Sequence, residues 1–118
     1  MKLCIDLDGT IANNKKNNET YEEVEPIENS VEVLTELKNQ GCYIIIYTAR
    51  NMGTYKNNLG LVIKNQAKIT IDWLEKWKVP YDELLFGKPN VDYFIDDKAI
   101  QFDNWLNIKN KIMEKVNV

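Results

Sequence analysis

The chain has 118 residues, of which 44% are hydrophobic and 28% are charged, and this composition is typical of a single soluble globular domain with its own core. Its net charge is −3 and its lysines do not gather into a basic patch, which argues against binding along a nucleic-acid backbone. No apolar run reaches the ~18 residues that span a bilayer, and acidic residues appear too early for a signal sequence. We therefore expect one cytoplasmic domain over residues 1–118, without a membrane or nucleic-acid partner.

Missing residue types restrict the chemistry further. The chain contains no histidine and a single serine, Ser30, which excludes a Ser-His or Cys-His nucleophile system. Cys4 and Cys42 fall in expected buried strands, where structural thiols are favoured over a disulfide, a redox pair or a zinc site. An enzyme with this sequence has to use carboxylates, lysine, arginine, threonine, tyrosine or a bound metal.

In the first half of the chain, apolar runs alternate with polar segments. The last apolar run, CYIIIY, is continuous and rich in β-branched residues, which favours a strand buried on both faces. The segment IANNKKNNETYEEVEP is polar and rich in asparagine, which is typical of a loop or small flap. We expect a strand, this loop, a helix and a second strand over 2–7, 11–26, Asn29 or Ser30 to Gly41, and 42–47.

The second half repeats the alternation of helix and strand. Trp73 and Trp77 lie four residues apart, so both rings can share one side of a helix, where they are expected to fill the core or a groove. We expect a loop, a helix, two short strands and a final helix over 51–62, 64–77, 84–86, 91–95 and 104–116.

Alternating strands and helices predict an α/β fold. The expected form is a three-layer sandwich around a doubly wound, mainly parallel, Rossmann-like sheet. Ligands bind such sheets at the carboxyl ends of the strands. Each polar residue at these ends could be an ordinary turn or cap, but together they predict one site. The residues at the expected strand ends are Asp6, Asp8, Gly9, Thr10, Thr48, Arg50, Lys88, Asp96 and Asp97.

The carboxylates of this set need a partner. Two carboxylates ~4 Å apart repel by about 4 kcal/mol at an effective dielectric constant near 20, so either some are protonated or a cation lies among them. Carboxylate oxygens are preferred ligands of Mg²⁺. Lys88 and Arg50, the only arginine in the chain, are suited to bind an anion such as phosphate on the other side of the pocket; the alternative for Arg50 is an ordinary surface position.

With these residues assembled, the chain resembles the haloacid dehalogenase superfamily of phosphotransferases over about residues 2–103. The sequence Asp6-Leu7-Asp8-Gly9-Thr10 matches the first family motif and is the most specific part of the resemblance. Thr48 after the second strand, Lys88, and the pair Asp96-Asp97 match the second, third and fourth motifs in order.

The resemblance implies a role for each matched residue. Asp6 would be the nucleophile that forms an aspartyl-phosphate, and Asp8 would protonate the leaving oxygen and later help to activate water. The remaining implied roles concern the metal, the phosphate and the substrate. The metal set is Asp6, the backbone carbonyl of Asp8, Asp96 and Asp97, of which Asp97 would act from outside the direct ligands of Mg²⁺. The phosphate set is Thr48, Lys88, Gly9 and Ala49. The substrate set is Arg50 and Asn51.

Family members often carry a cap domain, but the intervals between these motifs are too short for one here. Members without a cap act on large substrates or close their sites with a neighbouring subunit, so a homo-oligomer is one expectation. The sequences TARNM and FIDDKA resemble more narrowly the small phosphatases of bacterial capsule and surface-polysaccharide synthesis. The predicted function is Mg²⁺-dependent hydrolysis of a sugar-, polyol- or amino-alcohol-phosphate group.

Three alternatives stay open. A receiver-like phosphoacceptor domain has similar residues, but its acid pair normally ends the first strand and its phosphorylated aspartate the third, which is not the order here. A non-catalytic binding protein on the same fold is compatible with the sequence pattern. A metal-dependent D-x-D nucleotide-sugar transferase is a more remote option, because 118 residues leave little room for a nucleotide pocket.

Overall fold

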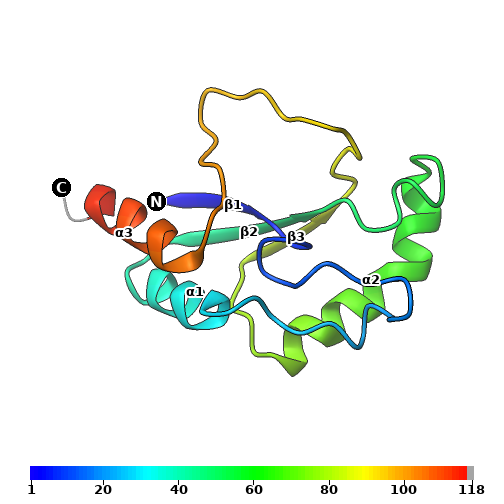
Figure 1. The fold of residues 1–118 in the computed structure, drawn as a ribbon, viewed down its shortest axis with the longest axis horizontal. Helices are drawn as coiled ribbons and strands as arrows, with labels where there is room; N and C mark the ends of the chain where they lie inside the picture. The colour runs from blue at the N-terminus through cyan, green and yellow to red at the C-terminus, as the bar shows by residue number, and fades with distance from the viewer. Residues whose placement is uncertain (117–118) are drawn as a thin grey trace.

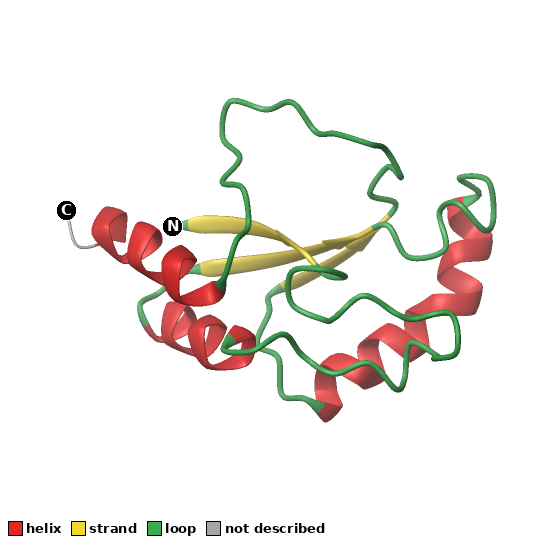
Figure 2. Cartoon of the chain, viewed as in Figure 1, coloured by secondary structure: helices red, strands yellow, loops and turns green. Residues whose placement is uncertain are grey.

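A computed structural model describes residues 1–116 and confirms the α/β class (Figure 2). In chain order its elements are β1 (Lys2–Asp6), α1 (Ser30–Asn39), β2 (Tyr43–Thr48), α2 (Leu59–Lys76), β3 (Glu83–Phe86) and α3 (Trp105–Val116). None of the helices in this part of the chain is both long enough and apolar enough to cross a membrane.

The three strands form one parallel sheet in the order β1-β2-β3. Ile5 of β1 lies opposite Ile46 of β2, and Ile46 lies opposite Leu84 of β3. Parallel neighbours need a crossover connection, and here α1 joins β1 to β2 while α2 joins β2 to β3. All three strands consequently end at the same edge of the sheet, which places their carboxyl-terminal residues side by side (Figure 1).

The helices bury one face of the sheet. Along β2, Ile44 and Ile46 are fully buried, whereas Tyr43 is 38% exposed and Ile45 is half-buried. The prediction that this strand is buried on both faces is therefore wrong. Cys4 is exposed for the same reason, since it lies on the uncovered face, while Cys42 is buried as expected.

Two tryptophans fasten the loop after β1 to the helices. The Trp105 indole Nε1 of α3 donates to the carbonyl oxygen of Thr10 at 2.6 Å, and the Trp73 Nε1 of α2 donates to that of Val24 at 2.8 Å. The ring centroids of Trp73 in α2 and of Trp77, the C-cap residue that ends this helix, lie 6.4 Å apart, as the spacing predicts. The long polar loop is thus held at both ends by buried indoles.

The ends of two helices differ from the prediction. Helix α2 begins at Leu59 rather than near residue 64, because the side chain of Asn58 accepts a hydrogen bond from the Leu61 amide at 3.2 Å and caps the first turn. Asn29 precedes α1 with a φ of 69° and makes no side-chain capping bond. The predicted capping there is therefore not observed.

The strand expected over 91–95 is not formed. The segment between β3 and α3 is a loop that arcs away from β1 (Figure 1), and its side chains include Tyr93, 87% exposed, and Ile95, 100% exposed. The chain turns off the line of β3 at Gly87, whose φ of 95° suits glycine, and Pro89 then offers no amide for a ladder. The outer edge of β1 is left without a partner strand among residues 1–116.

Candidate active site

The carboxyl ends of the strands bring five of the predicted residues to one place: Asp6 from β1, Asp8 just after it, Thr48 and Arg50 at the end of β2, and Lys88 after β3. The Lys88 amide donates to the carbonyl oxygen of Thr48 at 3.1 Å, which fixes the chain after β3 beside the end of β2. The predicted convergence on the sheet edge is confirmed for these residues.

Asp6 combines access to solvent with a nearby positive charge. Its side chain is 32% exposed, and its Oδ1 lies 3.1 Å from the ammonium of Lys88. The Thr10 hydroxyl donates to Oδ2 at a long 3.4 Å, and the ring of Phe94 covers the Lys88 ammonium at 4.7 Å. One carboxylate oxygen can therefore face an incoming substrate while the lysine offsets negative charge beside it.

Asp8 has a different partner. The Arg50 guanidinium holds both of its oxygens, with Nε 2.9 Å from Oδ2 and Nη2 3.0 Å from Oδ1. Leu7 between the two aspartates is fully buried, which confirms its place as a spacer pointing into the core. The two carboxylates that would repel each other are thus each matched by a separate cation, and this environment distinguishes Asp6 from Asp8.

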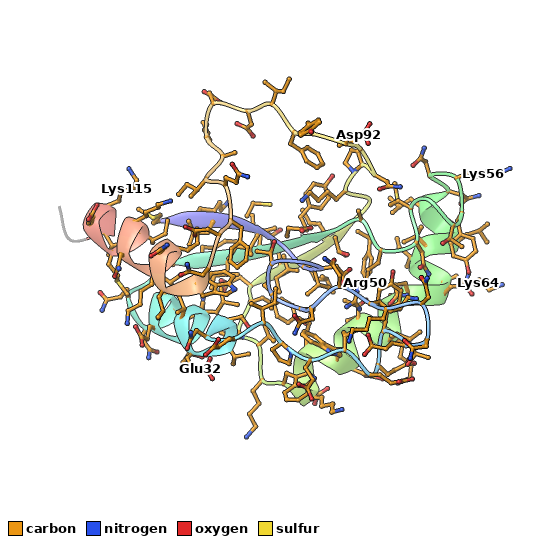
Figure 3. The ribbon with its side chains drawn as sticks, viewed as in Figure 1. Glu32, Arg50, Lys56, Lys64, Asp92 and Lys115 are labelled. Atoms are coloured by element: carbon orange, nitrogen blue, oxygen red, sulfur yellow. The ribbon has the colours of Figure 1, made fainter. Side chains whose placement is uncertain are left out.

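Arg50 is enclosed on several sides. Its side chain has no exposed surface, Nη1 donates to the hydroxyl of Thr70 in α2 at 3.2 Å, and the ring of Tyr21 lies 4.3 Å from the guanidinium carbon. Figure 3 shows Arg50 between the end of the sheet and the loop after β1. In this arrangement Arg50 contacts Asp8 and Thr70 and is not placed to make the predicted contact with a substrate.

Tyr21 and Thr70 are the site residues that the sequence analysis missed. Tyr21 lies in the loop after β1, where burial and the charge of Asp8 raise the pKa of its hydroxyl and keep it protonated. Thr70 lies within α2, and its hydroxyl donates in turn to Gln66 at 3.1 Å. Buried polar positions one turn apart on an otherwise apolar helix face are the signal that could have identified Thr70 and Gln66.

The turn after Asp8 requires glycine. Gly9 has a φ of 85°, and a Cβ at this position would lie 3.2 Å from Oδ1 of Asn14. Its amide donates to the carbonyl oxygen of Ala12 at 2.7 Å, so this N–H closes the turn instead of facing a phosphate. In this arrangement the amide of Gly9 is therefore not free to make the phosphate contact expected of this residue.

The turn after β2 is built on Thr48. Its hydroxyl is buried and accepts from the Arg50 amide at 3.1 Å, which leaves the hydroxyl proton able to donate to a phosphoryl oxygen. The Ala49 carbonyl accepts from the Met52 amide at 3.0 Å, and Asn51 adopts a φ of 59°. Residues 48–52 thus make a tight turn that directs Arg50 inward.

Asp96 and Asp97 lie apart from this cluster. Both are exposed in the loop between β3 and α3, and Asp96 Oδ1 accepts from the Lys98 amide at 2.8 Å. Residues 1–116 contain no group of three or more acidic, cysteine or histidine side chains placed to hold a metal. With the loop in this position, Asp96 and Asp97 therefore do not share a metal site with Asp6 and Asp8, whose charges are balanced by Lys88 and Arg50.

Comparisons with known proteins agree with this fold. A family model described as haloacid dehalogenase-like hydrolase matches residues 3–72, which include Asp6, Asp8 and Thr48 but neither Lys88 nor the Asp96-Asp97 pair. No curated protein gives a significant sequence match.

Solved structures to which this chain is similar include a target protein from Vibrio cholerae, with 38% identity, a TM-score of 0.78 and coverage of 97% of both chains. A chain of the Pnkp1/Rnl/Hen1 complex has 24% identity and a TM-score of 0.54; the match covers 97% of this chain and 34% of that one. A D,D-heptose 1,7-bisphosphate phosphatase from B. bronchiseptica, complexed with magnesium and phosphate, has 12% identity and a TM-score of 0.49, over 99% of this chain and 64% of its own.

Proposed function

Because the chain belongs to the family of haloacid dehalogenase-like hydrolases, we propose that this phosphatase cleaves phosphomonoesters through an aspartyl-phosphate on Asp6. The observation that carries the proposal is the contrast between its two aspartates. Asp6 is exposed to solvent beside the Lys88 ammonium, whereas Asp8 is held on both oxygens by Arg50. A nucleophile has to reach phosphorus, and a proton carrier has to be kept in one orientation.

The geometry supports a two-step reaction. In the first step a carboxylate oxygen of Asp6 forms a bond to phosphorus, the bond from phosphorus to the ester oxygen breaks, and Asp8 supplies the proton to the leaving alcohol. In the second step the oxygen of a water molecule bonds to phosphorus as the bond from phosphorus to the Asp6 oxygen breaks, and Asp8 takes a proton from that water. This releases inorganic phosphate, frees the Asp6 carboxylate and returns to Asp8 the proton that it gave to the alcohol. Lys88 and the Thr48 hydroxyl are placed to offset charge on the phosphoryl oxygens.

The test of the nucleophile is Asp6→Asn. We expect it to abolish hydrolysis of an aryl phosphate and to prevent trapping of phosphate on the protein. Asp82→Asn is the matched control, because Asp82 forms an ion pair with Lys38, 2.7 Å away, at the opposite end of the sheet. Full activity in Asp6→Asn would overturn the assignment.

Lys88→Met should lower kcat roughly 10²-fold, the usual effect of losing one preorganised charge-stabilising group.

We also propose that Mg²⁺ is the cofactor and that Asp6, the Asp8 carbonyl, Asp96 and Asp97 form its site. This arrangement requires the loop after Lys88 to approach the unpaired edge of β1. Support comes from the loop itself, whose run VDYFI has the composition of a strand and exposes the apolar side chains of Tyr93, Phe94 and Ile95. Pairing with β1 would occupy the free edge of the sheet and carry the Asp96-Asp97 pair to the end of the strand.

Hydrogen exchange tests the metal proposal independently of catalysis. Addition of Mg²⁺ should slow amide exchange over residues 91–97, and Asp96→Asn should prevent this protection. Glu114→Gln is the control, since Glu114 is an exposed carboxylate of α3. Unchanged exchange over this segment, together with activity that persists after chelation, would rule out a magnesium site here.

For the substrate we propose a sugar-, polyol- or amino-alcohol-phosphate group of a bacterial surface-polysaccharide precursor. The TARNM and FIDDKA sequences support this proposal, as does the Asp6 side chain, which is open to solvent. A panel of phosphorylated metabolites and larger phosphorylated conjugates tests it. A preference for phosphates outside these classes, measured as kcat/KM, would contradict it.

A further inference from the structure

We propose that Arg50 is a positioning residue that acts through Asp8, and that Tyr21 and Thr70 hold the guanidinium in place for this purpose. The inference rests on the proposed phosphatase function and deepens it, because it concerns delivery of the proton to the leaving group. Arg50 would then contribute to cleavage of the ester bond rather than to binding of the phosphate.

The contacts of the guanidinium carry this assignment. Two of its nitrogens, Nε and Nη2, donate to the carboxylate of Asp8, and the third, Nη1, donates to Thr70. A bidentate pair fixes both the position and the rotation of a carboxylate. Each nitrogen of the side chain has a protein partner, and because the side chain has no exposed surface its two remaining N–H groups are not open to a phosphoryl oxygen.

The surroundings resist movement of the arginine. The Tyr21 ring stacks 4.3 Å from the guanidinium carbon, and the Trp73 ring lies 6.0 Å from it. Such cation–π contacts gain strength when the cation is desolvated. The loop that carries Tyr21 is itself fastened to Trp73 through the Val24 carbonyl. Residues of the loop after β1 and of helix α2 therefore together hold Arg50, and through it the carboxylate of Asp8, in one orientation.

This role predicts a dependence on the leaving group. A poor leaving group, such as an alkyl oxygen, needs a proton in the transition state, whereas a nitrophenolate leaves without one. Misplacement of the acid by about 1 Å can cost on the order of 10²-fold in rate, and the acid itself contributes about 10²–10⁴-fold. Arg50→Gln should therefore lower kcat/KM roughly 10²-fold for an alkyl phosphate and by less than about tenfold for p-nitrophenyl phosphate.

The experiment compares kcat/KM across phosphate esters of graded leaving-group acidity for the wild type, Arg50→Gln and Arg50→Lys, each alone and combined with Asp8→Asn. We expect a steeper dependence in Arg50→Gln, partial recovery in Arg50→Lys, and no further loss when Arg50→Gln is added to Asp8→Asn. Inhibition by inorganic phosphate should be unchanged, since this probe reports phosphate binding without bond cleavage. Lys38→Gln, which removes the remote Lys38–Asp82 ion pair, is the control and should keep the wild-type dependence.

Other outcomes overturn the inference. Weaker inhibition by phosphate with an unchanged leaving-group dependence would show that Arg50 binds substrate, and additive losses in the double variant would show that it acts independently of Asp8. If Arg50→Gln does not fold, Tyr21→Leu gives the same test. We expect kcat/KM to depend more steeply on the acidity of the leaving group in this variant, and an unchanged dependence would contradict the inference. Asp6→Asn is assayed in parallel: if it stays active, the proposed nucleophile fails while the Arg50 comparison can still be interpreted, and absence of any phosphatase activity overturns both.

Discussion

The three tryptophans provide a sharp test of how the loop after β1 is held. Trp73 and Trp105 each donate a buried indole hydrogen bond to a backbone carbonyl of this loop. Trp77 presents a buried Nε1 that has no hydrogen-bond partner among the atoms of residues 1–116. Replacement by phenylalanine removes the indole N–H in all three cases. The free energy of unfolding should therefore fall more in the two variants that lose a hydrogen bond than in the one that does not.

The expected magnitudes follow from these contacts. In Trp73→Phe and Trp105→Phe a buried carbonyl loses its donor, which costs about 1–3 kcal/mol, and the smaller ring adds roughly 1 kcal/mol of lost packing. In Trp77→Phe no hydrogen bond is lost and an unpaired buried donor disappears, which offsets the loss of packing. We therefore expect the first two variants to be less stable than Trp77→Phe by about 1–3 kcal/mol, or roughly 4–12 °C in melting temperature for a domain of this size.

Urea unfolding followed by far-ultraviolet circular dichroism measures these differences without relying on tryptophan fluorescence. Trp105→Phe should also lower phosphatase activity, because the Thr10 carbonyl closely follows Asp8 and Gly9 in the chain. Equal destabilisation in all three variants would refute the reasoning, since it would mean that the indole hydrogen bonds add nothing beyond the volume of the ring.

Two further predictions concern the ends of the elements. Asn58→Ala should destabilise the protein by about 1 kcal/mol, measured by urea unfolding, because it removes the side-chain cap that the Leu61 amide uses; an unchanged midpoint would contradict the capping role. The pKa of Asp82 is lowered below 3.8, first by the hydrogen bond from Lys38 and then by that from the Ile44 amide. Since the folded state favours the ionised form, this contribution is complete above the unfolded pKa and is lost as the pH falls through the folded one. Stability measured from pH 6 to pH 2 should therefore fall less steeply at the acid end in Asp82→Asn than in the wild type, and parallel curves would count against the pair.

Short-range sequence patterns predicted most of the fold, because they report local physics. The apolar runs before Asp6 and Thr48 became parallel strands, and the crossover helices followed from the chain having to return to the same sheet edge. This connectivity alone brought Asp6, Asp8, Thr48 and Lys88 together. The roles assigned to Asp6 and Asp8 stay predictions until the variants are assayed.

The tertiary structure decided which groups pair with which. The sequence places Arg50 beside the site, but only the fold shows its guanidinium enclosed by Tyr21 and Thr70 and turned toward Asp8. The run VDYFI has strand composition, yet it lies off the sheet, because pairing with β1 depends on long-range contacts that composition does not specify. By itself the sequence thus determined which edge of the sheet carries these polar residues and of which types they are. Their partners depended on the tertiary structure, because a side chain's charge is local while its neutralisation depends on what packs against it.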